Sequence, residues 1–165
     1  MRCATVLVVL ALLLAAPAAS LGAEPAPAFT LSGLDGGSVT LASLKGKVVV
    51  LNFFRTFCPH CVKEVPELND LYLRLGPRGV AVLGMGLEAA DSLRRYVASH
   101  GVRYPVLVCS EEVRRAYSDV PGTGGLRGVP TTVIVSPSGQ VAKVFVGRPE
   151  NGLIERAVKR LLPTS

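Results

Sequence analysis

The sequence has little of several residue types on which common protein functions depend. Its 165 residues include no tryptophan and two histidines, and only 5% are aromatic and 18% charged. The net charge is +6, but the basic residues are scattered and few aromatic side chains lie between them. A nucleic-acid interface needs a clustered basic face, usually with aromatics that stack on bases, so we expect no nucleic-acid partner. The hydrophobic content of 49% excludes a disordered chain.

The composition also argues against a metal site. A structural zinc ion needs about four Cys or His ligands. The chain has four cysteines and two histidines, but only Cys58, His60 and Cys61 lie close together, and no second pair of ligands exists. We therefore expect no bound metal.

The N-terminal segment carries much of the hydrophobicity. Arg2 precedes an uncharged apolar run over residues 4–16, and Pro17 and small residues follow it. This pattern is typical of a secretory signal peptide, and the run is short for a membrane span, which needs about 20 apolar residues. We predict a signal peptide over residues 1–23, with an N-terminal membrane anchor as the alternative. Either way the rest of the chain is expected outside the cytoplasm, in the bacterial periplasm or at the outer face of the membrane.

The remaining residues suffice for one domain. Residues 24–28 contain only Glu, Pro and Ala and are predicted as a linker. Residues 29–165 are predicted to form a single domain, which at this length buries about two-thirds of its unfolded surface without a disulfide. No heptad repeat or broad apolar surface stripe indicates an obligate oligomer, so we expect a monomer.

Hydrophobic periodicity predicts alternating strands and helices. Residues 48–54 form an almost continuous apolar run, typical of a central strand covered on both faces. Apolar residues three and four apart predict the next helix, which Gly76 and Pro77 end. The other expected elements are a hairpin over 29–41, strands over 80–83, 105–108, 131–135 and 141–146, helices capped by Asp91 and Ser110, and a C-terminal helix from 153. This order predicts a mixed sheet with parallel crossovers first and an antiparallel hairpin last.

Two cysteines follow the predicted central strand. Cys58 and Cys61 lie where that strand gives way to a helix, and their spacing lets a disulfide close within one helical turn. Unpaired N–H groups and the positive end of the helix dipole stabilise a thiolate at the first position. We predict Cys58 as the nucleophile, Cys61 as the resolving thiol, and their reversible disulfide as the redox centre, with no other cofactor. A purely structural disulfide is the alternative, although so short a loop gives little entropic stabilisation.

The surrounding residues resemble a known family. The sequences G-K-V-V-V-L-N-F-F (46–54) and T-F-C-P-H-C (56–61), followed by Glu64 and by G-V-P-T-T (128–132), resemble the TlpA/ResA family of extracytoplasmic thioredoxin-like proteins. The likeness spans about residues 28–162. It implies an α/β thioredoxin-like fold in which helices flank a mixed central sheet, with an N-terminal β-hairpin and a central α/β insertion. It also implies reduction of protein disulfides, in cytochrome c maturation or at copper-site cysteines, with a membrane thiol reductase as electron donor.

The resemblance assigns roles to further residues. It makes Glu64, one helical turn after Cys61, the acidic group coupled to the thiols; a carboxylate near a thiolate in a low dielectric has a raised pKa and can act as a base for Cys61. An ordinary helix glutamate is the alternative. Val129, Pro130 and Thr131 open the strand that faces the cysteines in this fold. A cis peptide before Pro130 is implied, with the Val129 backbone left to pair with a substrate strand; an ordinary strand-start proline is the alternative.

The direction of electron flow receives two opposing signals. Pro59 suits a first helical turn, because the N–H that it lacks would have no partner there. Together Pro59 and His60 form the dipeptide of the oxidant DsbA, and a histidine that donates to the thiolate of Cys58 raises the reduction potential. The whole-chain resemblance favours a reductase. A DsbA-type oxidant is the alternative, and a copper-binding chaperone that uses both thiols and His60 is a third hypothesis.

Some positions depart from the family pattern. Asn52 stands where cytoplasmic thioredoxins carry a buried aspartate, and Phe54 and Phe57 stand where the family usually carries tryptophan, so an indole N–H donor is missing. Cys109 ends an apolar strand and is expected to be a buried, inert thiol.

Two other activities are rejected on their motifs. The loop over residues 122–128 nearly matches a dinucleotide-binding fingerprint, but Arg127 replaces the third glycine and the loop follows a helix. We interpret this loop as a partner-contacting segment or as simple lengthening. Peroxidase chemistry of the peroxiredoxin type needs Pro and Thr at other spacings before Cys58, and Thr56 alone does not provide them.

Overall fold

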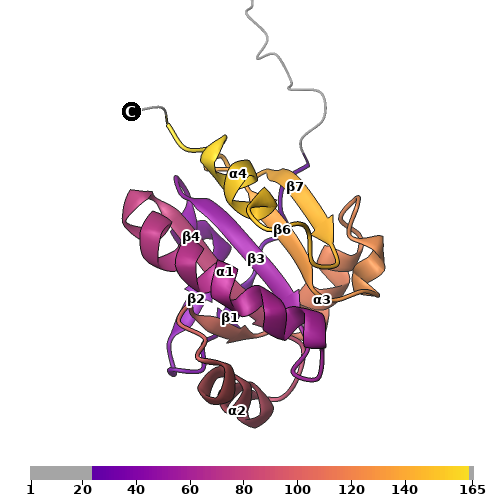
Figure 1. Cartoon of the computed structure of the whole chain (residues 1–165). Coiled ribbons are helices and arrows are strands. Elements are labelled where there is room, and N and C mark those ends of the chain that lie inside the picture. The colour runs from indigo at the N-terminus through magenta and orange to yellow at the C-terminus, as the bar shows by residue number, and fades with distance from the viewer. Residues whose placement is uncertain (1–23, 164–165) are drawn as a thin grey trace, which may run out of the picture.

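A computed structural model describes residues 24–163, and the signal peptide predicted over residues 1–23 lies outside them. Its main sheet has the strand order β5-β4-β3-β6-β7 (Figure 1). The strands are β3 (Val48–Phe54), β4 (Val80–Gly86), β5 (Val106–Val108), β6 (Thr131–Val135) and β7 (Val141–Val146). The pairs β3–β4 and β4–β5 are parallel, and β3–β6 and β6–β7 are antiparallel. The expected mixed sheet is therefore present.

Helices cover both faces of this sheet. The helices are α1 (Pro59–Leu75), α2 (Ala90–His100), α3 (Glu111–Ser118) and α4 (Leu153–Lys159). Side chains of α1, α2 and α4 share one apolar cluster with the sheet, whereas α3 packs in a second cluster on the other face. The N-terminal hairpin, β1 (Thr30–Ser32) and β2 (Ser38–Thr40), joins this second cluster. Figure 1 shows α1 lying along the centre of its face with α4 beside it.

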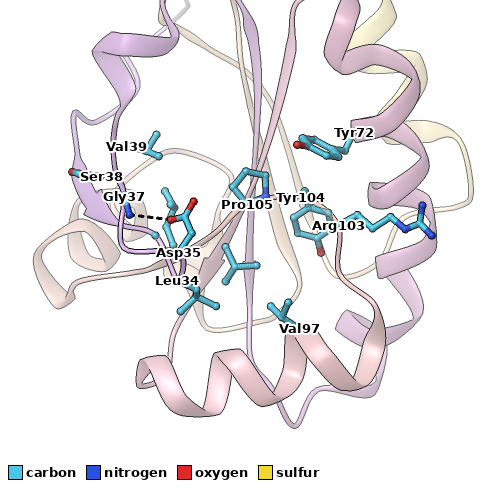
Figure 2. Close-up of a pocket in the computed structure, with 13 residues that line it drawn as sticks. Leu34, Asp35, Gly37, Ser38, Val39, Tyr72, Val97, Arg103, Tyr104 and Pro105 are labelled. Carbon is cyan, nitrogen blue, oxygen red and sulfur yellow. Dashed lines mark hydrogen bonds between the residues drawn. The ribbon is translucent and has the colours of Figure 1, made fainter.

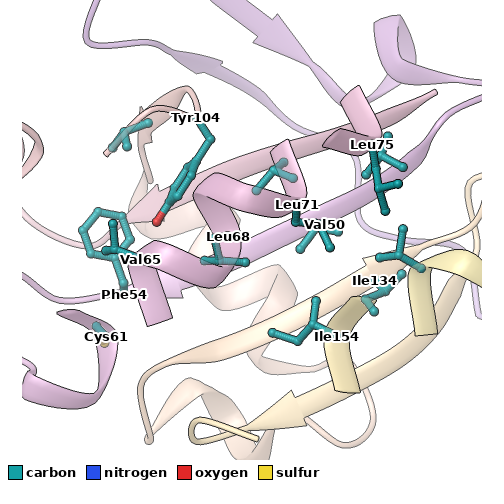
Figure 3. Close-up of a cluster of buried hydrophobic side chains, with 14 of the residues drawn as sticks. Val50, Phe54, Cys61, Val65, Leu68, Leu71, Leu75, Tyr104, Ile134 and Ile154 are labelled. Atoms are coloured by element: carbon teal, nitrogen blue, oxygen red, sulfur yellow. The ribbon is translucent and has the colours of Figure 1, made fainter. Parts of the chain in front are cut away.

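Strand β3 is buried on both faces, as its sequence predicts. All seven residues are buried, and the side chains of Val50 and Phe54 enter the cluster under α1 (Figure 3). Leu51 and Phe53 enter the cluster under α3. Because both faces are covered, an almost uninterrupted apolar run is the sequence that this position requires.

Two predicted boundaries are wrong. β4 continues to Gly86 rather than ending at residue 83, because its last residues pair with both β3 and β5. Helix α2 begins at Ala90 with Ala89 as its N-cap, and Asp91, predicted as the cap, lies in the first turn. The Asp91 carboxylate accepts a hydrogen bond from Arg94 at 2.9 Å. Ser110, by contrast, caps α3 as expected and accepts from the Val113 N–H at 3.2 Å.

Residues 24–28, predicted as a linker, are held against the domain. The Val141 N–H donates to the Glu24 carbonyl at 2.8 Å, and the Ala26 N–H donates to the Gly139 carbonyl at 3.0 Å. The buried Tyr117 donates its hydroxyl to the Pro27 carbonyl at 2.9 Å. These backbone groups therefore extend the edge of the sheet beside β7 instead of remaining in solvent.

A surface pocket lies between the N-terminal hairpin, α1 and α2 (Figure 2). Asp35 stabilises the hairpin turn at its rim, where its carboxylate accepts from the Gly37 N–H at 3.1 Å. The pocket is lined by residues 33–35, 37–39, 72, 97 and 103–107, none of which is a predicted site residue.

The packing of β4 against α2 yields a stability prediction. A Cβ on Gly86 would overlap both methyl carbons of Leu93, which is fully buried. We expect Gly86→Ala to lower the free energy of unfolding by about 1–3 kcal/mol, the usual cost of overpacking a core. Gly76→Ala is the matched control, since Gly76 has a φ of −51° and no neighbouring atom within 4 Å of the added Cβ. Denaturant unfolding of the two variants checks this, and equal stabilities would contradict the packing.

Candidate active site

The first cysteine lies where the central strand meets helix α1. Cys58 is the N-cap of α1, and its Sγ accepts a hydrogen bond from the Cys61 N–H at 3.2 Å. Pro59 occupies the first helical turn, as predicted. The side chain of Cys58 is buried apart from an exposed fraction of 8%, and both sulfurs are free thiols. A backbone donor thus faces the sulfur that is predicted to become a thiolate.

The predicted substrate-binding residues adjoin this thiol. The Val129–Pro130 peptide bond is cis, as the resemblance implies. The Val129 carbonyl accepts from Cys58 Sγ at 3.4 Å, so the segment before β6 lies against the cysteine. Thr131 begins β6, and its hydroxyl donates to the Gly128 carbonyl at 2.7 Å. Residues that lie about seventy positions apart in the sequence therefore share one site.

Glu64 is a residue of α1, and its side chain is completely buried. Its Oε2 accepts from Asn52 Nδ2 at 2.7 Å, whereas its Oε1 has no hydrogen-bond partner within residues 24–163. Burial raises the pKa of Glu64 to about 7, although the hydrogen bond from Asn52 acts in the opposite direction. A carboxyl group with this pKa exchanges a proton readily near neutral pH. The alternative, an ordinary helix glutamate, shares the position on α1, but this side chain is fully buried.

Cys61 lies deeper than Cys58. It packs beside Phe54 and Val65 in the cluster under α1 (Figure 3). Burial is the largest cause of a raised pKa at Cys61, and its contact with Cys58 and the charge of Glu64 act in the same direction. The second thiol therefore keeps its proton at neutral pH, and its conversion to a nucleophile needs a nearby proton acceptor.

The side chains that precede α1 face solvent. Phe57 has an exposed fraction of 73%, and the Arg55 guanidinium lies 5.8 Å from the centre of its ring. Arg55 also pairs with Glu88 at 3.4 Å. His60 is exposed, and the described hydrogen bonds to Cys58 Sγ do not include one from its ring. Phe54, the other aromatic that replaces tryptophan, is buried.

Cys109 lies just after β5 and is half-buried. Burial raises the pKa of its thiol to about 11. Cys109 is therefore less buried than predicted, and a thiol that stays protonated at neutral pH is a poor nucleophile.

Sequence reasoning missed Thr132. This residue lies on β6 directly opposite Asn52 on β3, and its Oγ1 accepts from Asn52 Nδ2 at 2.9 Å. Asn52 is the one polar residue of the apolar, buried strand β3, whereas Thr132 is the second of two threonines that open the buried strand β6. The polar residue inside the apolar run of β3 is the signal that the sequence offered.

Comparisons with known proteins agree with this geometry. Residues 23–144 match the model of the AhpC/TSA family. The chain is 31% identical over 140 residues to the thiol-disulfide oxidoreductase ResA of Bacillus subtilis (strain 168), covering 84% of this chain and 74% of that protein. It is 30% identical over 141 residues to the ResA of Bacillus thuringiensis (strain Al Hakam), covering 85% and 78%. The chain belongs to the TlpA/ResA-like family of thioredoxin-fold thiol-disulfide oxidoreductases.

A solved structure supports the fold of this TlpA/ResA-like protein. This chain superimposes on a thiol:disulfide interchange protein of the thioredoxin family from Chlorobium tepidum TLS with a TM-score of 0.79 and 34% identity. The superposition covers 88% of this chain and all of that chain. The thioredoxin-like fold expected from the resemblance is therefore confirmed. Between residues 24 and 163 no helix combines the length and apolar character of a membrane span.

The buried carboxyl group makes the stability of the fold pH-dependent. The pKa of Glu64 is about 7 in the folded chain against an ordinary value of 4.5. Its stabilising contribution is therefore fully present below about pH 4.5 and is lost as the pH rises through about 7. We expect the free energy of unfolding of the reduced wild type, relative to Glu64→Gln, to fall by about 3 kcal/mol between pH 4.5 and pH 8. Urea unfolding across this range measures the difference, and a constant offset between the two proteins would contradict the assignment.

Proposed function

We propose that this protein reduces disulfide bonds of protein substrates outside the cytoplasm, through a cycle in which Cys58 and Cys61 alternate between dithiol and disulfide. The observation that carries the proposal is the asymmetry of the two thiols. Cys58 receives a backbone hydrogen bond at the end of a helix, whereas Cys61 is buried one turn before a carboxyl group whose pKa is about 7. This arrangement suits an attacking thiolate followed by a resolving thiol.

In the first step the Cys58 thiolate attacks one sulfur of the substrate disulfide. A bond forms between Cys58 Sγ and that sulfur, and the other substrate sulfur leaves as a thiolate that takes a proton from solvent. The backbone of Val129 lies within hydrogen-bond reach of Cys58. In our proposal it pairs with the incoming substrate segment, and the buried residues Pro130 and Thr131 hold it in position.

In the second step Cys61 gives its proton to Glu64 and attacks Cys58 Sγ. The bond between Cys58 and the substrate breaks, and the second substrate sulfur leaves as a thiolate and is protonated. The substrate has then gained two electrons and two protons, and Cys58 and Cys61 are joined by a disulfide. A second thiol reductase, which we place in the membrane, returns two electrons and two protons to restore the dithiol. The cycle uses no cofactor beyond this disulfide.

The reducing direction is supported by the family and by the position of His60. The oxidant alternative depends on a histidine that stabilises the Cys58 thiolate, but the His60 ring is exposed and the described donor to Cys58 is the Cys61 N–H. We further propose that the protein acts as a monomer, and that its substrates are apocytochrome c or the cysteines of copper sites. The secretory pattern of residues 1–23 supports a periplasmic location.

Trapping tests the proposed order of attack. With Cys61→Ser the second step cannot occur, so incubation with a disulfide-bonded protein such as insulin is expected to accumulate a mixed disulfide on Cys58. Cys58→Ser is the matched control and is expected to form no adduct. Non-reducing electrophoresis and peptide mass mapping identify the linked cysteine. An adduct on Cys109, or equal adduct formation by both variants, would contradict the proposal.

A further inference from the structure

Two polar residues face each other inside the main sheet. Asn52 on β3 is paired with Thr132 on β6, and their exposed fractions are 2% and 1%. Both strands are buried along their length, and Asn52 is the one polar residue of β3, whereas β6 opens with Thr131 and Thr132. Burial of an amide or hydroxyl group costs free energy unless hydrogen bonds compensate it. The hydrogen-bond partners of these two side chains therefore indicate their role.

The contacts of this pair converge on Glu64. Asn52 Nδ2 donates one hydrogen to Glu64 Oε2 at 2.7 Å and the other to Thr132 Oγ1 at 2.9 Å. The Glu64 carboxylate can only accept, so it requires the N–H end of the amide, and the bond from the second hydrogen of Nδ2 to Thr132 holds the amide in that position. Thr132 therefore orients Asn52, and Asn52 holds Glu64.

We propose that Asn52 and Thr132 are positioning residues that fix the Glu64 carboxyl group by Oε2 and leave Oε1 as the oxygen that takes the proton of Cys61. The inference deepens the proposed function and rests on its use of Glu64. The N–H of Asn52 already points at Oε2, and a carboxyl proton on Oε2 that pointed toward Asn52 would meet this N–H. In the neutral carboxyl group the proton therefore resides on Oε1, the oxygen without a partner within residues 24–163.

The other charges near Glu64 do not replace this hydrogen bond. Glu67, one turn further along α1, raises the pKa of Glu64, and Arg148, beyond β7, lowers it. Cys61 and the buried tyrosines Tyr96 on α2 and Tyr104 before β5 also feel the charge of Glu64. Among the interactions that lower the pKa of Glu64, the hydrogen bond from Asn52 has the largest effect.

An amide is suited to this position where an aspartate would not be. A carboxylate at residue 52 would face Glu64 Oε2 at hydrogen-bond distance, and two carboxylates so close together cannot both ionise. Asn52 thus avoids a second carboxylate in hydrogen-bond contact with Glu64, in contrast to the buried aspartate of cytoplasmic thioredoxins.

The test is a direct titration of Glu64 in the reduced full-length protein, by carbon-13 NMR of labelled glutamate with Glu64→Gln used for assignment. Loss of a hydrogen bond to a charged group is expected to raise the pKa of Glu64 by about one to two units in Asn52→Ala. Thr132→Val is expected to shift it in the same direction by less, and Thr132→Ser, which keeps the hydroxyl, is expected to restore the wild-type titration. Thr123→Val is the matched control, because it removes another buried hydroxyl, one that donates to the Val120 carbonyl at 2.9 Å on the loop after α3.

Kinetics separate this inference from the proposed function. In Asn52→Ala the pH profile of single-turnover release from the mixed disulfide is expected to move upward with the titration, and in a Glu64→Gln background Asn52→Ala is expected to add no further change. An unchanged Glu64 titration in folded Asn52→Ala, or an additive effect in the double variant, would overturn the positioning role. If the Cys61→Ser variant forms no mixed disulfide at all, the proposed function fails, while the NMR titration still decides whether Asn52 and Thr132 govern Glu64.

Discussion

The burial of β3 on both faces is the constraint on which the site depends. A strand in this position must be apolar, so its one polar residue, Asn52, needs partners inside the protein, and it finds them in Glu64 on α1 and Thr132 on β6. The same strand ends at Phe54, and the chain then turns into α1, whose N-cap is Cys58. One element therefore places both the attacking sulfur and the buried group that supports the second thiol.

Both cysteines are buried, and their local contacts separate them chemically. Cys58 is at the helix end, where a backbone N–H reaches its sulfur and the Val129 carbonyl adjoins it. Cys61 lies three residues further on, and burial raises its pKa and that of Glu64. Glu64, whose pKa is about 7, is partly ionised at neutral pH and is therefore available to accept the proton that Cys61 releases when it attacks. The fold pays for this proximity with a carboxyl group that destabilises it at neutral pH.

Local sequence signals predicted the strands, helices and thiols of this protein better than its buried polar contacts. The apolar run of β3, the hairpin of β6 and β7 and the Ser110 cap follow from periodicity and turn chemistry, and the Cys58–Cys61 spacing located the thiols. The Asp91 cap and the end of β4 were wrong, because helix starts and strand ends depend on neighbours that are distant in sequence. Glu64 came from family resemblance and Thr132 was missed, since the pairing of Asn52 with Thr132 across eighty residues is fixed only by strand register.

The reduction potential of the Cys58–Cys61 couple tests the proposed direction of electron flow most directly. The protein is equilibrated in thiol–disulfide buffers of known potential, and the free thiols are counted by mass shift after alkylation, since no tryptophan is present to report the state by fluorescence. A reductase is expected to have a potential near that of thioredoxin, about −270 mV. A value near that of DsbA, about −120 mV, would contradict the reducing role and identify the protein as a disulfide donor.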